Sequence, residues 1–170
     1  GKIDLDYLIR YTNAAFLVNR DPESDEFGLF VRGDDGKPMV WDRVTSKAVP
    51  HDDPDAKPAM KGDFPSPDTG RCTPAFELMA RKYLDDQYAP DAVADRCGVK
   101  ADTIRRLAAE LAHTAFEEEI TIDQPWTDWL GRKQDKMIGR PVSFHAMRGI
   151  SAHSNGFQTC RALHLLQIIL

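Results

Sequence analysis

The spacing of apolar residues predicts helices in the second half of the chain. Apolar side chains recur three and four positions apart over residues 76–84 and 104–115, as on one face of a helix. Thr73-Pro74 predicts an N-cap followed by proline at the first helical position. A shorter helix is expected from Pro90 to Cys97, where Gly98 ends it.

The last predicted helix differs from the others in its pattern. It runs from Phe157 to Leu170 and is apolar on nearly all sides after Arg161. Such a helix is typically buried between layers of structure, which is the position we expect for it.

Strand-like runs alternate with these helices. They comprise Ile120–Ile122 and Pro141–Met147, and this alternation predicts an α/β fold in which amphipathic helices pack on a short, mostly parallel sheet. Upstream, Asp35-Gly36 lies between two short apolar runs and indicates a β-hairpin. The range Pro22–Pro67 holds seven of the 11 prolines, which predicts an irregular surface excursion. Residues 1–72 are thus expected to be irregular strand and loop, and 73–170 helical and α/β.

Composition places the chain among water-soluble globular proteins. Of its 170 residues, 42% are apolar and 29% charged, and no 18-residue apolar run or signal-peptide pattern is visible. A net charge of −5 opposes non-specific attraction to nucleic acid. The apolar end, 163–170, is unusual for a terminus, so the chain is expected to be an internal segment of a larger protein.

The cysteines and histidines suggest no metal centre. Cys72, Cys97 and Cys160 lack the spacing of a zinc ribbon or disulfide framework, which favours a reducing compartment. Cys160 and His164 lie four residues apart on the last helix, but a zinc site needs three or four ligands. No metal ligand and no catalytic residue is therefore predicted.

The junction between the 141–147 run and the last helix carries the best candidate site. Gly149 and Gly156 bracket a loop whose backbone N–H groups would face the positive end of the helix dipole, which suits phosphate. The side-chain donors of this loop are Arg148, Ser151, His153, Ser154 and Asn155. The alternative is that Ser154 or Asn155 only caps the helix and the glycines only turn the chain.

Residues 88–107 resemble a helix-turn-helix in outline, with Lys100, Arg105 and Arg106 on the second helix. Acidic and basic residues balance from Asp91 to Leu111, whereas a phosphate-binding face needs a basic surplus. A helical hairpin that packs on a core is therefore favoured, and a helical interaction module or a DNA-binding module remains the alternative function.

Several pieces, in a fixed order, resemble the catalytic subunits of the molybdopterin oxidoreductase (dimethyl sulfoxide reductase) family over essentially the whole chain. They are Tyr11-Thr12-Asn13, Phe16-Leu17-Val18, Val40-Trp41-Asp42, Thr73 to Leu78, Tyr88 to Asp91 with Cys97-Gly98-Val99, Met147-Arg148-Gly149, His153 to Gly156 and Arg161-Ala162. Within the family, the chain is most similar to the thiosulfate, polysulfide and sulfite-oxidising branch.

The resemblance implies a segment of a larger molybdenum enzyme that acts on an inorganic sulfur compound. Its cofactor would be molybdopterin guanine dinucleotide, with a 4Fe-4S cluster elsewhere in the parent protein. By this resemblance, the residues of this chain expected to contact the cofactor are Arg148, Gly149, Ser151, His153, Asn155 and Gly156. Expected partners are the remainder of the catalytic subunit together with iron-sulfur electron-transfer and membrane anchor subunits, with no nucleic acid. A cytoplasmic location is favoured, and a periplasmic one stays open.

Overall fold

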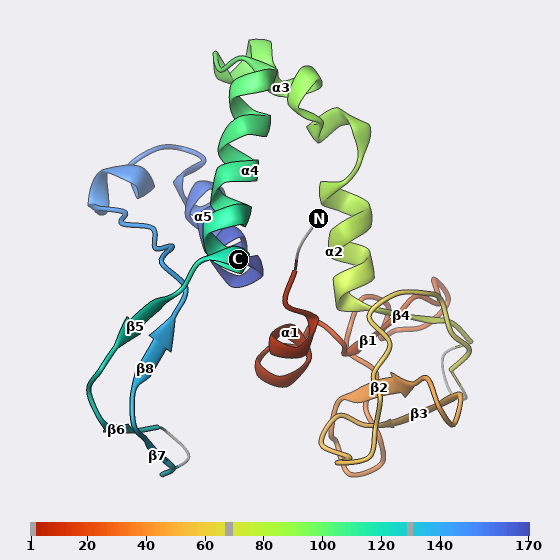
Figure 1. Cartoon of the computed structure of the whole chain (residues 1–170). Coiled ribbons are helices and arrows are strands. Elements are labelled where there is room, and N and C mark those ends of the chain that lie inside the picture. Colours follow the sequence, from red (N-terminus) through yellow and green to blue (C-terminus); the bar gives the residue numbers. More distant parts are fainter. Residues whose placement is uncertain (1–2, 67–69, 129–130) are drawn as a thin grey trace. The chain divides into compact units, whose positions relative to one another are not determined.

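The computed structural model describes residues 3–66, 70–128 and 131–170 (Figure 1). The chain divides into two compact units. The N-terminal unit is Leu5–Ala89, and the C-terminal unit is Pro90–Leu170 together with the residues before Leu5. Among the described residues, no helix is both long and apolar enough to cross a membrane.

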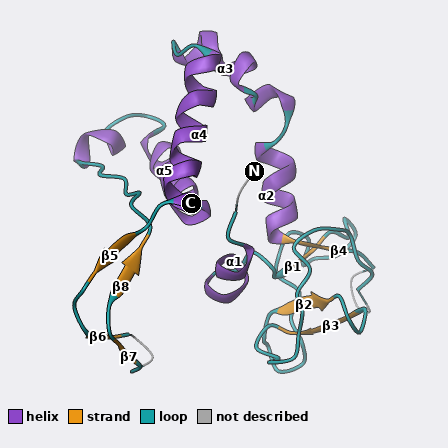
Figure 2. Ribbon diagram, viewed as in Figure 1, coloured by secondary structure: helices purple, strands orange, loops and turns teal. Residues whose placement is uncertain are grey.

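The N-terminal unit is built on two small antiparallel sheets (Figure 2). β1 (Leu17–Asn19) pairs with β4 (Cys72–Pro74), and β2 (Met39–Asp42) pairs with β3 (Lys47–Pro50). The helices of this unit are α1 (Leu5–Tyr11), α2 (Ala75–Tyr83) and the 3-10 helix η1 (Asp86–Tyr88). The short strands are consistent with a proline-rich sequence, because proline cannot donate a ladder hydrogen bond.

Two apolar clusters form the core of this unit. The first joins Leu8, Ala15, Val40, Met60 and Phe76, and the second joins Leu17, Val31 and Cys72. Trp41 stacks on Phe64 beside the second cluster, with ring centroids 4.6 Å apart. Burying a side chain such as Leu17 stabilises the fold by roughly 1.5–3 kcal/mol.

The predicted irregular excursion over Pro22–Pro67 is confirmed in part, because its described residues hold no regular element besides β2 and β3, but the range does not lie wholly at the surface. That range supplies β2, β3 and the buried side chains of Val31, Val40 and Met60. The turn predicted at Asp35-Gly36 is present, since the Gly36 N–H donates to the Gly33 carbonyl at 2.8 Å. The two arms of the predicted hairpin are paired, since the Gly33 N–H donates to the Lys37 carbonyl and the Met39 N–H donates to the Val31 carbonyl, both at 2.9 Å, on either side of a bridge between residues 32 and 38. Pro67 itself lies outside the described residues.

The predicted cap at Thr73 is wrong. Thr73 is fully buried in β4, and Pro74 occupies the N-cap position of α2 without a side-chain cap hydrogen bond. The Thr73 hydroxyl donates to Asp63 instead, at 2.5 Å. Pairing with β1 thus keeps the backbone extended until Ala75.

The helices predicted in the C-terminal unit are confirmed. α3 is Pro90–Cys97 and α4 is Ala101–Glu117. Gly98 ends α3 in the left-handed region, at φ +69°, where glycine has no Cβ to clash. The two helices contact each other as a helical hairpin.

The strands after α4 form an antiparallel ribbon. β5 (Ile120–Ile122) pairs with β8 (Met137–Gly139), and β6 (Trp126–Thr127) pairs with β7 (Lys133–Gln134). Mixed helix and strand content confirms the α/β class, but every paired strand in the described residues is antiparallel. The mostly parallel sheet was therefore predicted wrongly. A connection as short as that between β6 and β7 can join only antiparallel neighbours, because a parallel pair needs a long crossover.

The end of the C-terminal unit departs further from the sequence pattern. Residues 141–147 form no strand, and the 3-10 helix η2 (Arg148–Ser151) follows them. α5 (Gly156–Ile169) forms as predicted. The prediction that it is buried is wrong, because Phe157 is 76% and Ile168 42% exposed.

Arg140 ties distant segments of the C-terminal unit together. Its guanidinium donates to the Asp4 carboxylate at 2.5 Å and to the Leu170 carbonyl. The same group lies 4.8 Å from the ring centroid of Phe116, at the end of α4. The residue before α1 is thereby attached to the unit formed by residues 90–170.

Candidate functional site

The candidate loop, Arg148–Gly156, consists of one 3-10 turn and a second turn that leads into α5. In η2, the N–H of Ala152 donates to the Gly149 carbonyl at 3.2 Å, and the Ser151 hydroxyl donates to the Arg148 carbonyl at 2.9 Å. In the second turn, the Gly156 N–H donates to the His153 carbonyl at 2.9 Å. The loop therefore has a defined backbone shape set by its own hydrogen bonds.

Position 156 requires glycine because the backbone of Ser151 packs directly against it. The residue is buried, and a Cβ at this position would fall on the Ser151 carbonyl oxygen and lie 2.6 Å from its carbonyl carbon. Contacts that short with a backbone group cannot be relieved by a side-chain rotation. Gly156 thus holds the beginning of α5 against η2.

Gly149 has a different environment. A Cβ there would meet nothing within 4 Å, and its φ is not in the left-handed region. Neither packing nor backbone conformation therefore requires glycine at this position. The Gly149 Cα is open to the outside of the loop, where another molecule could approach the backbone closely.

The beginning of α5 has no side-chain cap. Asn155 occupies the N-cap position with φ −104° and ψ 15°, and its side chain makes no cap hydrogen bond. Its carbonyl accepts from the Thr159 N–H at 3.0 Å and from the Thr159 hydroxyl at 3.2 Å. The interpretation that Asn155 serves only as a cap is not supported.

The other predicted residues are exposed. Arg148, Ser151, His153 and Asn155 all present their side chains to the outside. The Ser151 hydroxyl is engaged within the loop, so the guanidinium, imidazole and amide of the other three form the outward donor set. This set, together with an uncapped helix start, is suited to an anion.

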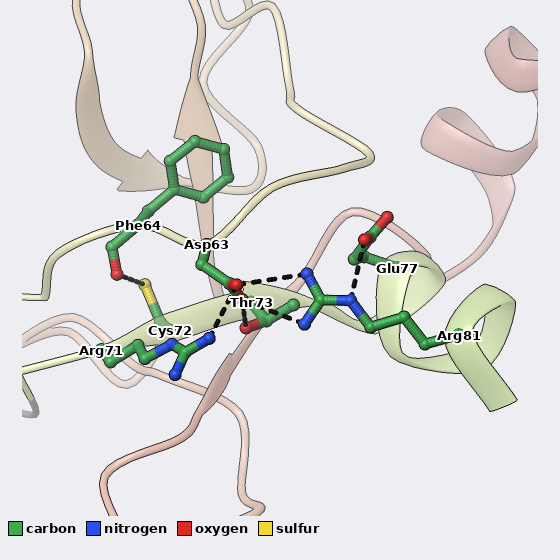
Figure 3. Close-up of polar contacts among 7 residues, drawn as sticks. All are labelled: Asp63, Phe64, Arg71, Cys72, Thr73, Glu77 and Arg81. Carbon is green, nitrogen blue, oxygen red and sulfur yellow. Dashed lines mark hydrogen bonds and ion pairs between the residues drawn. The ribbon is translucent and has the colours of Figure 1, made fainter.

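A second polar cluster, centred on Asp63 in the N-terminal unit, was not predicted (Figure 3). Arg71 donates to Asp63 at 2.7 Å and Arg81 at 3.2 Å, in addition to the Thr73 hydroxyl. These donors, the Thr73 hydroxyl first, hold the pKa of the Asp63 carboxyl well below its ordinary value. Arg81 also pairs with Glu77 one helical turn away, which is the only part of the cluster that sequence spacing could indicate.

This cluster joins three segments of the N-terminal unit rather than forming a reactive centre. It links the segment before β4, β4 itself and α2. Beside it, burial and then the charge of Asp63 raise the pKa of the Cys72 thiol to about 11. The Cys72 thiol donates to the Phe64 carbonyl at 3.5 Å and is therefore a protonated core group at neutral pH.

The basic residues of α4 are paired with acidic neighbours. Arg105 contacts Asp91 and Asp102, and Arg106 contacts Glu110 at 2.7 Å. These pairs agree with the balanced charge read from the sequence. The hairpin of α3 and α4 is present, but α3 buries no residue and α4 only Ala115, so its predicted packing on a core is not confirmed. Within residues 3–66, 70–128 and 131–170, the structure contains no group of three or more histidine, cysteine or acidic side chains that could hold a metal ion.

Comparison with known proteins places the chain beside two dehydrogenase subunits. In an alignment 179 positions long, it is 41% identical to the A subunit of sulfite dehydrogenase from Allochromatium vinosum, and the match covers the whole chain and 18% of that relative. It is 35% identical over 102 residues to the alpha subunit of formate dehydrogenase 2 (cytochrome c-553) from Nitratidesulfovibrio vulgaris, across 60% of the chain and 9% of the relative. No family model matches the chain.

The chain thus spans less than a fifth of the length of the relatives it matches. Both relatives are named as dehydrogenase subunits, which supports the predicted relation to oxidoreductase subunits at that general level.

Proposed function

We propose that this chain is a segment of the catalytic subunit of a molybdopterin-dependent oxidoreductase. The observation that carries the proposal is the 41% identity to the sulfite dehydrogenase subunit over the whole chain. The order of motifs in the sequence, from Tyr11-Thr12-Asn13 to Arg161-Ala162, points to the same family.

The role of the segment would be to help bind molybdopterin guanine dinucleotide through the loop Arg148–Gly156. The residues present fit a polyanionic group, because Arg148, His153 and Asn155 are exposed donors and α5 begins without a side-chain cap. Gly149 would let a phosphate group approach the backbone, and Gly156 with Ser151 would hold the loop in shape.

When bound, the cofactor supplies two-electron transfer at molybdenum, commonly together with an oxygen atom. The residues of this chain would anchor and orient it. Arg148 offers a permanent positive charge with paired N–H groups that match phosphate oxygens. We expect the isolated 170 residues to have no catalytic turnover, because this chain would only anchor the cofactor. A molybdenum-dependent activity of the purified chain would contradict this role.

The substrate of the parent protein would be an inorganic sulfur compound. The match to the sulfite dehydrogenase subunit spans the whole chain, whereas the match to the formate dehydrogenase subunit spans 60% of it. The proposed partners are the rest of the catalytic subunit together with iron-sulfur electron-transfer and membrane anchor subunits. A 4Fe-4S cluster would lie elsewhere in the parent, and the proposed compartment is the cytoplasm.

The test uses the full-length protein that contains this chain. Arg148→Ala and Gly149→Val should each lower the molybdenum and pterin content of the purified protein, because one removes a phosphate donor and the other blocks the open Cα. Arg106→Ala and Gly139→Val are the matched controls, since Arg106 is an exposed helical arginine and Gly139 an equally open glycine. Full cofactor content in both loop variants would refute the proposed role.

The alternatives give different results in the same protein. For a helical interaction module, both loop variants would keep their full cofactor content. For a DNA-binding module, the chain would bind duplex DNA at low salt, with an affinity that falls steeply as salt rises.

A further inference from the structure

A hollow with a volume of about 660 Å³ lies in the N-terminal unit, remote in sequence from the candidate loop. It opens between the end of α1 and the segment after β3. We call it the His51 hollow, and its lining residues are Ile9, Arg10, Tyr11, Thr12, Asn13, Ala15, Phe16, Val40, His51, Asp53, Ala56 and Pro58. Its volume lies within the roughly 300–1,000 Å³ typical of sites for small organic ligands.

The floor of the His51 hollow is part of the core. Ala15 and Val40 are each 1% exposed and belong to the apolar cluster that includes Leu8 and Phe76. Phe16 and Ala56 are half-buried, pack against the same cluster and present the apolar surface that a ligand could contact. Because these residues are fixed by core packing, the apolar floor does not need to form when a ligand arrives.

One wall is the turn that ends α1. The Thr12 hydroxyl donates to the Leu8 carbonyl at 2.5 Å and accepts from the Ala14 N–H at 3.1 Å. The Phe16 N–H donates to the Asn13 carbonyl at 3.1 Å. These bonds fix the backbone that carries Arg10 and Asn13 at the rim.

The opposite wall is the segment after β3, and it is fixed in the same way. The His51 N–H donates to the Pro38 carbonyl at 2.9 Å, and the His51 ring lies edge-on to Phe16 with centroids 5.1 Å apart. The Asp53 carboxylate accepts from the Asp55 N–H at 2.9 Å, and the Ala56 N–H donates to the Asp53 carbonyl. Both walls are therefore preorganised.

The rim is richer in donors than in acceptors. Arg10 supplies a guanidinium, Asn13 an amide and His51 an imidazole, and all three residues are exposed. The carboxylate of Asp53 already accepts a backbone hydrogen bond. An apolar floor below a donor rim that includes an arginine matches a ring-bearing molecule with a negative head group.

We propose that the His51 hollow binds a small organic anion, an aromatic or alicyclic carboxylate, with its ring against the half-buried side chains of Phe16 and Ala56 and its head group toward Arg10. This site is independent of the loop Arg148–Gly156. The outcome of its test therefore leaves the proposed cofactor role untouched, and the reverse also holds.

The test titrates the 170-residue chain with 2-naphthoate and follows backbone amide signals by NMR. We expect saturable shifts confined to residues 9–16, 40 and 51–58. Arg10→Gln should weaken binding about tenfold, the loss expected for a charge-assisted hydrogen bond. Arg20→Gln is the matched control, because Arg20 lies over Phe27 and does not line the hollow.

Two further measurements separate this site from a general apolar surface. Ala56→Leu should weaken the shifts, because three added carbon atoms narrow the hollow where the ring would lie, and far-ultraviolet circular dichroism would verify its fold. The neutral analogue 2-naphthalenemethanol should bind about tenfold more weakly than 2-naphthoate. Equal binding of the neutral analogue, unchanged binding by Arg10→Gln or Ala56→Leu, or the absence of saturable shifts would overturn the proposal.

Discussion

Replacing Gly156 with alanine tests the packing of the candidate loop most directly. At an ordinary helix position, glycine to alanine stabilises by up to about 1 kcal/mol, because alanine loses less conformational entropy. At Gly156, the new Cβ would lie 2.6 Å from the Ser151 carbonyl carbon and 2.8 Å from its Cα. The two effects on stability have opposite signs, so whether Gly156→Ala stabilises or destabilises the start of α5 shows which effect is larger.

The size of the effect follows from the displacement that the Cβ requires. An ordinary van der Waals contact begins at 3.4 Å, so the Ser151 carbonyl carbon would have to move by about 0.8 Å, and the carbonyl oxygen, which lies closer still, by more. Overpacking of this kind costs typically about 1–3 kcal/mol, and a backbone neighbour places it at the upper end. After the propensity gain of alanine is subtracted, a net loss of about 2 kcal/mol remains.

Hydrogen exchange measures this loss where it occurs. The Thr159 amide, which donates to the Asn155 carbonyl, should exchange about 30-fold faster in Gly156→Ala, if opening of the first turn of α5 limits exchange. Gly149→Ala is the control, because its Cβ would enter open space, and protection should stay equal or rise. Unchanged or greater protection in Gly156→Ala would refute the packing argument.

Three other predictions concern the N-terminal unit. Leu17→Ala should lower its free energy of unfolding by about 2–5 kcal/mol, measured by urea denaturation, because Leu17 is completely buried. The low pKa of Asp63 means that its ionised form stabilises the fold above the ordinary value of 3.8, and this contribution is lost as pH falls below it. Asp63→Asn should therefore flatten the dependence of stability on pH between about pH 4 and pH 2, and an unchanged slope would contradict the role of the cluster. In thiol titration with Ellman's reagent at pH 8, exposed Cys97 should react at once and Cys72 only after unfolding, because Cys72 is buried with a pKa of about 11.

Helices were predictable from the sequence where local signals agreed. α3 and α4 have apolar residues at helical spacing and a glycine between them, so neighbouring residues alone specify them. The sheets were not predictable in this way, because pairing depends on partners far away in the chain. β1 lies more than fifty residues before β4, and the sequence pattern contains no sign of that pairing.

The core of the proline-rich range was missed for a related reason. Val31 and Val40 lie in the two short apolar runs beside Asp35-Gly36, and Met60 is buried next to Ala59, but runs of two or three residues are too short to show a period. The parallel sheet was predicted because strand-like runs alternate with helices in the sequence. In the structure, β5 pairs with β8, which precedes residues 141–147 in the chain, and residues 141–147 form no strand.

The candidate loop was located from its sequence, but the functions of its two glycines were not distinguishable there. Glycine serves both where the backbone must pack closely and where a ligand must approach. The structure assigns the first role to Gly156, whose Cβ would overlap the Ser151 backbone, and leaves Gly149 free for the second.

The contact between Arg140 and Asp4 has a consequence for synthesis on the ribosome. The two residues are 136 positions apart, and the whole N-terminal unit, Leu5–Ala89, lies between them in the chain. Synthesis adds about 5–20 residues per second, so Arg140 is made roughly 7 to 27 s after Asp4. The N-terminal unit is complete much earlier, so it can fold while the C-terminal unit still lacks its α4, ribbon and α5.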